Sequence, residues 1–243
     1  MDSLPHADVV GSMLRPAALL QARQDLAGGR ISAAEFKRIE DAAVDAAVAV
    51  QVDAGLGIVT DGEMRRLSFQ SQMPEAVDGF GQFDLDAFMW GSWHGDADVG
   101  DLSVGRPPAL GVVGKLRRKR HLSVEEFTYL RGKTGSVVKT TLPSPSLFAN
   151  FWSPAQSLDA YSTLDAFLSD VASILRDEVA ELARLGATYV QLDAPHYPLI
   201  LDPAWSAFYA SQGWSAADWV ALGIELDNSV IDAFPDVTFA FHL

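Results

Sequence analysis

In residues 175–195 the chain reads LRDEVAELARLGATYVQLDAP, and this stretch decides the predicted fold. Apolar side chains recur every three or four residues over about Leu164–Leu185, which predicts an amphipathic helix that ends at Gly186. The apolar run over residues 188–192 then predicts a buried strand, which stops at Asp193. A helix followed at once by a short buried strand is the repeating unit of a parallel α/β fold.

The same alternation continues on both sides of this stretch. Ser32 followed by Glu35 has the spacing of a capping box, and Gly55 stands where a C-terminal helix cap belongs. Strands that are separated by helices pair in parallel, so we predict a parallel sheet. The pattern predicts strands at residues 7–11, 57–60, 137–142, 188–193 and 237–242, and further helices at about residues 15–26, 32–53 and 216–234.

Most of the predicted strands end in polar residues, which favours a (β/α)8 TIM barrel, because all strands of a barrel end at one face. The alternative is a doubly wound sheet, which normally has a glycine-rich phosphate loop after an early strand, and the sequence has none. About five βα units fit into the chain, whereas a barrel has eight. We therefore predict that residues 1–243 form a single incomplete TIM-barrel domain, the front part of a longer protein.

Residues from about 74 to 133 interrupt the alternation and are rich in Gly, Asp, Phe and Trp. We predict an excursion from the barrel here, with a hairpin or irregular segment between Phe83 and Arg106. A second capping-box spacing at Ser123 predicts the start of a short helix. The basic run at residues 117–120 is interpreted as a solvated face.

The composition excludes several classes of protein. The 243-residue chain has no cysteine, so it holds neither a disulfide scaffold nor a zinc site built on its own thiolates. With 18 Lys and Arg against 32 Asp and Glu, the net charge of −14 disfavours nucleic acid as a partner. No apolar run approaches the roughly 20 residues of a membrane span, and the N-terminus lacks a secretory signal, so we expect a cytoplasmic protein without a membrane partner.

Four polar residues stand at the carboxyl ends of predicted strands, and each alone has an ordinary structural explanation. Ser12 suits a turn, Glu63 a solvated turn, Asp193 a helix cap and His242 a buried histidine. If the strands are parallel neighbours, however, these side chains converge. Carboxylates near a serine suit an amino-acid-like ligand, and a histidine at a strand end suits a metal, although one ligand cannot hold zinc.

Five stretches, in the same order, resemble the cobalamin-independent methionine synthase family, and more narrowly its short, single-barrel members. The similarity extends along the whole chain and is weakest from about residue 80 to residue 131. The stretches are HADVVGSMLRP (6–16), QVDAGLGIVTDGEMRR (51–66), KTTLPSPS (139–146), LRDEVAELARLGATYVQLDAP (175–195) and VTFAFHL (237–243).

The resemblance implies a zinc-dependent methyltransferase that moves a methyl group from a methyl-folate to the thiol of homocysteine and forms methionine. It implies that Ser12 binds the carboxylate end of homocysteine, and that Glu63 and Asp193, as binding and catalytic residues, hold its ammonium. His242 matches the first zinc ligand of the family. The Cys that follows it there would be residue 244, and the other ligands would lie on later strands.

The sequence departs from the family in two places. Asp193 is followed by Ala194-Pro195-His196-Tyr197 rather than by Glu-Pro. We also expect the folate-binding N-terminal half of the long enzymes to be missing, because it would have no room before Met1. These departures leave other methyl donors open, and with them other alkyl donors such as a corrinoid or an epoxide. Aromatic side chains that are candidates for stacking on a flat donor are Trp90, Trp93 and Trp152.

Two further classes of function stay open. One is a barrel of the porphyrinogen-decarboxylase type, which needs no metal and for which Arg65 and Arg66 are the candidates to bind propionates. The other is a non-enzymatic chain that binds a thiol amino acid without turnover. The oligomeric state is not predicted.

Overall fold

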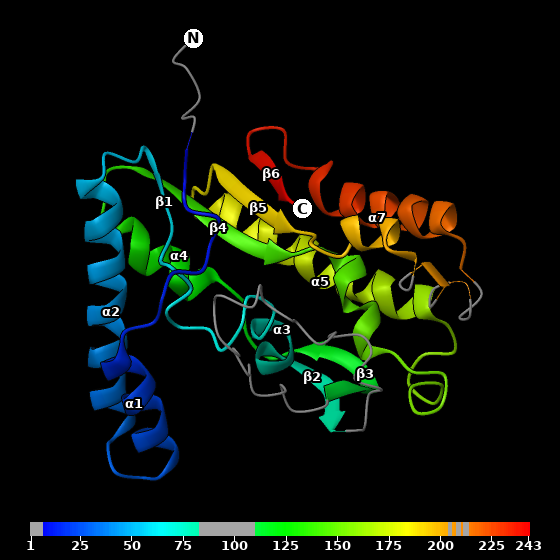
Figure 1. Ribbon diagram of the computed structural model, residues 1–243, viewed down its shortest axis with the longest axis horizontal. Helices are drawn as coiled ribbons and strands as arrows, with labels where there is room; N and C mark the ends of the chain where they lie inside the picture. The colour runs from blue at the N-terminus through cyan, green and yellow to red at the C-terminus, as the bar shows by residue number, and fades with distance from the viewer. Residues whose placement is uncertain (1–6, 83–109, 204–205, 208–209, 211–213) are drawn as a thin grey trace.

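A four-stranded parallel sheet is the centre of the computed structural model, which describes residues 7–82, 110–203, 206–207, 210 and 214–243. The strand order is β1-β4-β5-β6 (Figure 1). The strands are β1 (Ile58–Val59), β4 (Val137–Pro143), β5 (Tyr189–Asp193) and β6 (Thr238–His242). This arrangement confirms the predicted α/β class with a parallel sheet. The sheet is open over the described residues, so the closed eight-stranded barrel stays a prediction.

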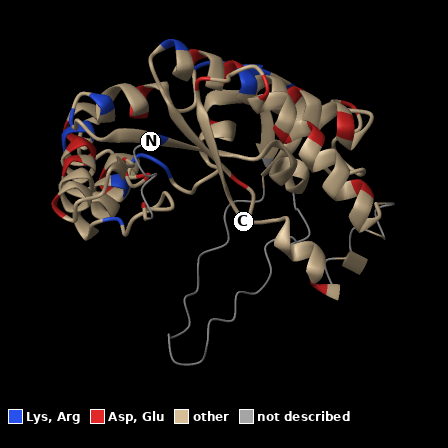
Figure 2. Cartoon of the chain, turned by 90° about the horizontal axis from the view of Figure 1, so that it is seen from above, with Lys and Arg blue, Asp and Glu red and all other residues tan. Residues whose placement is uncertain are grey.

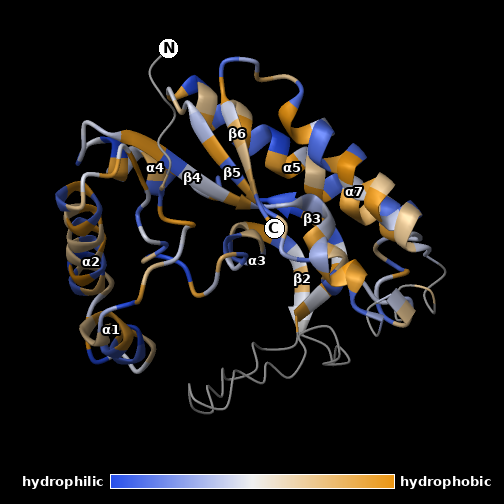
Figure 3. Ribbon diagram, turned by 45° about the horizontal axis from the view of Figure 1, so that its top comes forward, coloured by the Kyte–Doolittle hydropathy of each residue, from blue (hydrophilic) through white to orange (hydrophobic). Residues whose placement is uncertain are grey.

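Helices form an arc around this sheet and carry most of the charged side chains (Figure 2). Helix α5 packs against both α7 and α4, and α1 packs against α2. Apolar and polar stretches alternate along α5 and α7 (Figure 3). The helices are α1 (Ala17–Ala27), α2 (Ala33–Asp53), α3 (Gln72–Ala76), α4 (Val124–Arg131), α5 (Leu164–Arg184) and α7 (Ala216–Ile231), with short 3-10 helices η2 (Pro145–Phe151) and η3 (Pro198–Leu201). In the part of the chain described here, no helix is both long and apolar enough to cross a membrane.

The carboxyl ends of β4, β5 and β6 lie level with one another. The register pairs Pro143 with Asp193, and Asp193 with His242. Two backbone hydrogen bonds continue this alignment past the strands, from Ser144 N to Asp193 O at 2.9 Å and from Ala194 N to His242 O at 2.7 Å. Side chains at these ends therefore start from one edge of the sheet.

The helix signals in the sequence are confirmed at the start of α2 but only in part at the start of α4. The Ser32 hydroxyl accepts a hydrogen bond from Glu35 N at 3.2 Å, as the capping-box spacing predicts. Helix α4 begins after Ser123 as expected, yet the Ser123 hydroxyl does not cap it. That hydroxyl donates to Gln72 Oε1 at 2.9 Å instead, so tertiary contact replaces the local cap.

The first predicted strand, residues 7–11, is wrong, because this segment has no ladder partner in the structure. Its backbone carbonyl oxygens accept hydrogen bonds from side chains of β5 and of the residue after β1 instead. Gln191 Nε2 donates to Val10 O at 2.7 Å, and Thr60 Oγ1 donates to Gly11 O at 3.1 Å. The segment thus lies across side chains of the sheet, and four of the five predicted parallel strands are found.

The predicted excursion contains an antiparallel pair, β2 (Val77–Gln82) with β3 (Leu110–Arg118), as well as α3 and α4. The expected hairpin at residues 83–106, with Trp90 and Trp93, lies outside the described residues. The basic run forms ion pairs at the surface, as its interpretation as a solvated face requires. Arg117 and Lys119 contact Asp78, Arg118 contacts Asp177, and Arg120 contacts Glu75.

A buried carboxylate on α5 accepts hydrogen bonds from backbone N–H groups at the start of α4. Glu178 is 0% exposed and accepts hydrogen bonds from Leu122 N at 2.9 Å and Ser123 N at 2.7 Å. Its other contact is His121 Nδ1 at 2.8 Å. Free N–H groups at a helix start need acceptors, and a carboxylate there also suits the helix dipole. Glu178 therefore fixes the excursion to the helix that covers the sheet.

We expect Glu178→Gln to lower the free energy of unfolding by about 2 kcal/mol, because the hydrogen bonds from two buried N–H groups lose a charged acceptor, and the amide NH2 repels any N–H that it faces. Urea denaturation measures this. The control is Glu181→Gln, one turn along α5, which removes a surface ion pair with Arg184 and is expected to cost about 0.5 kcal/mol or less. Equal effects of the two changes would contradict the capping role of Glu178.

A buried polar cluster joins the loops after β4 and β5 to helix α7. Ser146 Oγ lies 2.7 Å from His196 Nε2 and 3.1 Å from Ser144 Oγ. Ser144 Oγ and Tyr197 OH donate to the two oxygens of Asp227, at 2.8 and 2.7 Å. The cluster locks the two loops that follow the strand ends to a helix, and so limits how far those ends can move.

Burial lowers the pKa of His196 to about 4, while an unfolded histidine titrates near 6.5. Between these values the unfolded chain binds the proton more tightly, so stability is lost as pH falls from about 6.5 towards 4. We expect this fall in the free energy of unfolding to be smaller in His196→Gln by about 2–3 kcal/mol, measured by urea denaturation at each pH. Parallel pH curves for the two proteins would contradict the neutral, buried state of His196.

Candidate functional site

A pocket of about 280 Å³ opens at the carboxyl ends of the strands and is lined by all four residues that the sequence singled out. Ser12 lies on the N-terminal segment, Glu63 on the turn after β1, Asp193 at the end of β5 and His242 at the end of β6. The expected convergence is therefore confirmed, whereas the roles of these residues stay predictions. The remaining lining residues are Val10, Gly11, Phe69 and Pro195.

The turn after β1 is held in an unusual backbone conformation. Gly62 has φ +68°, and Glu63 has φ +54°, which a residue with a side chain rarely adopts. Side chains of the same turn enforce it: Asp61 Oδ1 accepts from Glu63 N at 2.9 Å, and Thr60 Oγ1 accepts from Gly62 N at 3.0 Å. Such a conformation costs about 1–3 kcal/mol and is most common at functional sites.

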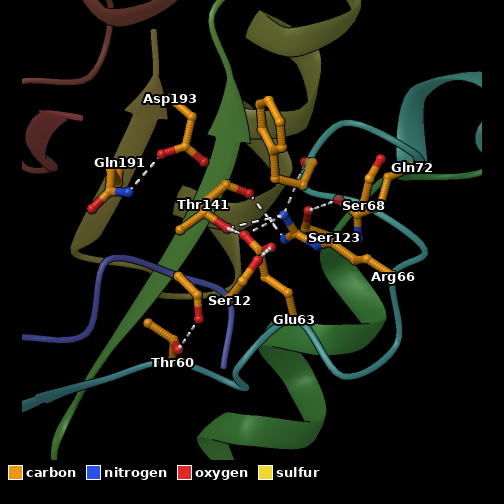
Figure 4. A network of polar contacts seen from close by, with 12 residues as sticks. Ser12, Thr60, Glu63, Arg66, Ser68, Gln72, Ser123, Thr141, Gln191 and Asp193 are labelled. Atoms are coloured by element: carbon orange, nitrogen blue, oxygen red, sulfur yellow. Dashed lines mark hydrogen bonds and ion pairs between the residues drawn. The ribbon is translucent and has the colours of Figure 1, made fainter. Parts of the chain in front are cut away.

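Glu63 is 1% exposed, and its carboxylate is held on both oxygens (Figure 4). Oε2 accepts from the Ser12 hydroxyl, and Oε1 accepts from Thr141 Oγ1 at 2.8 Å and from Arg66 Nη1 at 3.3 Å. A Cβ on Gly11 would lie 2.8 Å from Oε1, so glycine is required for this close approach. The Ser12 hydroxyl is engaged with Glu63, and a ligand carboxylate would compete for it.

Asp193 is the second buried acid of the pocket, at 4% exposure. Its Oδ1 accepts from Gln191 Nε2 at 2.7 Å and lies 3.2 Å from His242 Nδ1. Burial raises the pKa of Asp193, and the charge of Glu63 adds to this, while the contacts with Gln191 and His242 oppose it. A buried acid whose pKa is raised by burial and by a neighbouring carboxylate is stabilised in its charged form by a nearby cation.

Arg66 is buried beneath the pocket at 1% exposure. Its Nη2 donates to Glu126 at 2.8 Å and to Thr141 O at 2.9 Å. Burial lowers its pKa, but the charges of Glu126 and Glu63 outweigh that and leave the pKa raised. Arg65 pairs with Glu40 and Asp41. Neither arginine is free to hold a propionate, which argues against the decarboxylase-type alternative.

Sequence reasoning missed the residues that support the pocket. Thr141, two residues before the end of β4, and Glu126, far from the pocket in sequence, were not singled out, and Phe69 had no signal at all. Arg66 was noted only as a propionate ligand, although its spacing of three residues from Glu63 hints at the ion pair that forms. Trp152, a candidate for stacking on a donor, is packed against the core and donates to Tyr161 O at 3.3 Å.

His242 fits a zinc site only as one ligand. Its Nδ1 faces the Asp193 carboxylate, which leaves Nε2 as the metal-binding atom and resembles the carboxylate–histidine pairs that orient zinc ligands. Zinc needs three or four protein ligands. Among the described residues there is no group of three or more His, Cys, Asp or Glu that could hold a metal ion.

Comparison with known proteins supports the resemblance seen in the sequence. The chain is 26% identical over 250 residues to the uncharacterized protein YxjH of Bacillus subtilis, covering 98% of this chain and 61% of that protein. It is 31% identical over 191 residues to a methionine synthase of Pyrococcus abyssi, covering 77% and 51%. The chain thus spans only about half to three fifths of these relatives.

A solved structure shows the same fold. The B12-independent methionine synthase of Shewanella sp. W3-18-1, in complex with selenomethionine, aligns with a TM-score of 0.69 at 22% identity. The alignment covers 99% of this chain and 62% of that chain. Residues 4–233 match the family model for the catalytic domain of cobalamin-independent synthase, a match that ends before His242. The chain therefore belongs to the cobalamin-independent methionine synthase family.

Proposed function

We propose that this chain binds homocysteine at the strand ends and takes part in transfer of a methyl group to its thiol. The observation that carries the proposal is the meeting of Glu63 and Asp193, both buried, in one pocket with Ser12. Membership of the family supports it, as does the relative whose structure holds selenomethionine, an analogue of the expected product.

In this proposal each residue has a defined part in binding. Glu63 and Asp193 together hold the ammonium, because a cation between two buried acids relieves their mutual repulsion. The Ser12 hydroxyl now donates to Glu63. When the Ser12 side chain rotates away from Glu63, its hydroxyl donates to the carboxylate of the bound amino acid instead. Phe69 and Pro195 line the pocket with apolar surface for the aliphatic part of the side chain.

Zinc is the proposed metal, with His242 as the one ligand that the described residues offer. When bound, zinc would hold the thiol as a thiolate, the form that attacks a methyl group. The proposed methyl donor is a methyl-folate. The alternative is another alkyl donor, such as an epoxide or a corrinoid.

A second candidate is binding of a thiol amino acid without turnover. It needs no metal and rests on the same two acids in the pocket. The two candidates share the ammonium site and differ in whether zinc and methyl transfer accompany binding.

We expect methionine, as product, to bind to this chain, and both Glu63→Gln and Asp193→Asn to weaken that binding about tenfold or more, since each removes a charged hydrogen bond to the ammonium. Isothermal titration calorimetry measures this with methionine and with 4-(methylthio)butanoate, which lacks the ammonium. The butanoate is expected to bind the variants no more weakly than it binds the wild type.

The control for this pair is Asp53→Asn, an exposed acid at the end of α2. Like each of the two pocket variants, Asp53→Asn removes one negative charge. Wild-type protein that binds methionine and the butanoate equally well would refute the ammonium site, and equal loss with Asp53→Asn would refute its location.

We expect zinc content well below one per chain after dialysis against a chelator, because a single imidazole does not retain zinc. His242→Ala should remove most of the remaining zinc, and Asp193→Asn should not, as measured by mass spectrometry of the metal. Chelator-resistant, stoichiometric zinc that survives His242→Ala would place the metal on other residues and overturn the assignment of His242.

A further inference from the structure

Behind the pocket, a chain of buried polar contacts leads from Glu63 into the excursion. Arg66 is its first link, because it contacts Glu63 on one side and Glu126 on the other, at 3.3 and 2.8 Å. Gln72 Nε2 then donates to Glu126 Oε1 at 2.5 Å, and Ser123 Oγ donates to Gln72 Oε1 at 2.9 Å. Figure 4 labels four of these residues, Glu63, Arg66, Gln72 and Ser123.

Every residue in this series of polar contacts is buried. Arg66, Gln72 and Ser123 are 1%, 4% and 0% exposed, and Glu126 is 7% exposed. None of Arg66, Gln72, Glu126 and Ser123 lines the pocket, so none contacts a ligand there. Buried charges of this kind need complete sets of partners, and removal of one partner changes the position of the next.

The contacts of Arg66 explain how its position reaches the pocket. Its Nη1 donates to Thr141 Oγ1 at 2.9 Å, and Thr141 Oγ1 donates in turn to Glu63 Oε1 at 2.8 Å. Glu126 holds the opposite edge of the guanidinium through Nε and Nη2. A planar guanidinium that is fixed on one edge presents its other edge at a fixed angle.

Glu126 and Glu63 both pair with Arg66, so the two carboxylates compete for its positive charge. Three carboxylates, Asp61, Glu63 and Glu126, surround this guanidinium, and Lys139 lines the same small cavity as Asp61, Arg66 and Glu126. Glu126 accepts from both Nε and Nη2 of Arg66, whereas Glu63 receives one contact from Nη1 at 3.3 Å. Arg66 therefore pairs more closely with Glu126 than with Glu63.

We propose that Glu126 and Gln72 are positioning residues for the amino-acid pocket, which act through Arg66 on the orientation and charge of Glu63. This inference rests on the proposed function for the identity of the ligand. It assigns part of the excursion, α3 and α4, to ligand selection, although these helices do not line the pocket.

The test compares methionine with 4-(methylthio)butanoate, as the ratio of their dissociation constants, in the full chain. Glu126→Gln is expected to weaken methionine binding about tenfold and to leave the butanoate within about twofold, since only the interaction with the ammonium changes. In a Glu63→Gln background the same change should have little further effect, because Glu126 acts through Glu63. A purely structural role would weaken both ligands equally.

The matched control is Glu125→Gln, the neighbouring acid on α4, whose side chain is 71% exposed and pairs with Lys37. It should leave the ratio unchanged. If Glu126→Gln does not fold, Gln72→Met, which keeps all charges, is expected to shift the ratio in the same direction by a smaller factor.

The outcomes separate this inference from the proposed function. Wild-type protein that does not prefer methionine overturns the proposed function and this inference together. Wild-type preference that survives both Glu126→Gln and Gln72→Met overturns this inference alone. A crystal structure of Glu126→Gln in which Glu63 keeps its contacts with Ser12 and Thr141 would also overturn it, whichever ligand binds.

Discussion

The burial of Arg66 is the constraint on which the pocket depends. A guanidinium keeps its charge at every physiological pH, so a fold that buries it must supply acceptors on all its edges. Those acceptors come from the turn after β1, from the end of β4 and from α4 in the excursion. One side chain thereby joins a strand end, its neighbouring strand and an inserted helix.

The pocket above Arg66 combines a strained backbone with an excess of negative charge. Glu63 adopts a left-handed conformation that its own turn enforces, and Gly11 admits the N-terminal segment against its carboxylate. Asp193 faces the same space, with a pKa raised by burial and by Glu63. A cation is the ligand that such an arrangement favours, and the proposed ammonium of an amino acid meets that requirement.

Hydrogen bonds at the strand ends hold the acidic residues of the pocket in place. The register keeps Asp193 level with Pro143 and His242, and the cluster around Asp227 fixes the loops that follow to α7. Within the described residues the sheet is held at these ends by backbone bonds and buried polar contacts. Acidic side chains can therefore be held near one another despite their repulsion.

Sequence patterns were enough to predict the α/β class, the parallel strands at β1, β4, β5 and β6, and the convergence of Ser12, Glu63, Asp193 and His242. Periodicity and strand ends are local properties, and parallel pairing brings those ends to one edge. Three features emerge from the folded chain alone: residues 7–11 are not a strand, Ser123 binds Gln72 instead of capping its helix, and Arg66 joins Glu63 to Glu126. Each of these depends on a partner distant in sequence, because a buried donor or charge takes whichever acceptor the fold brings within reach, and no local pattern records that choice.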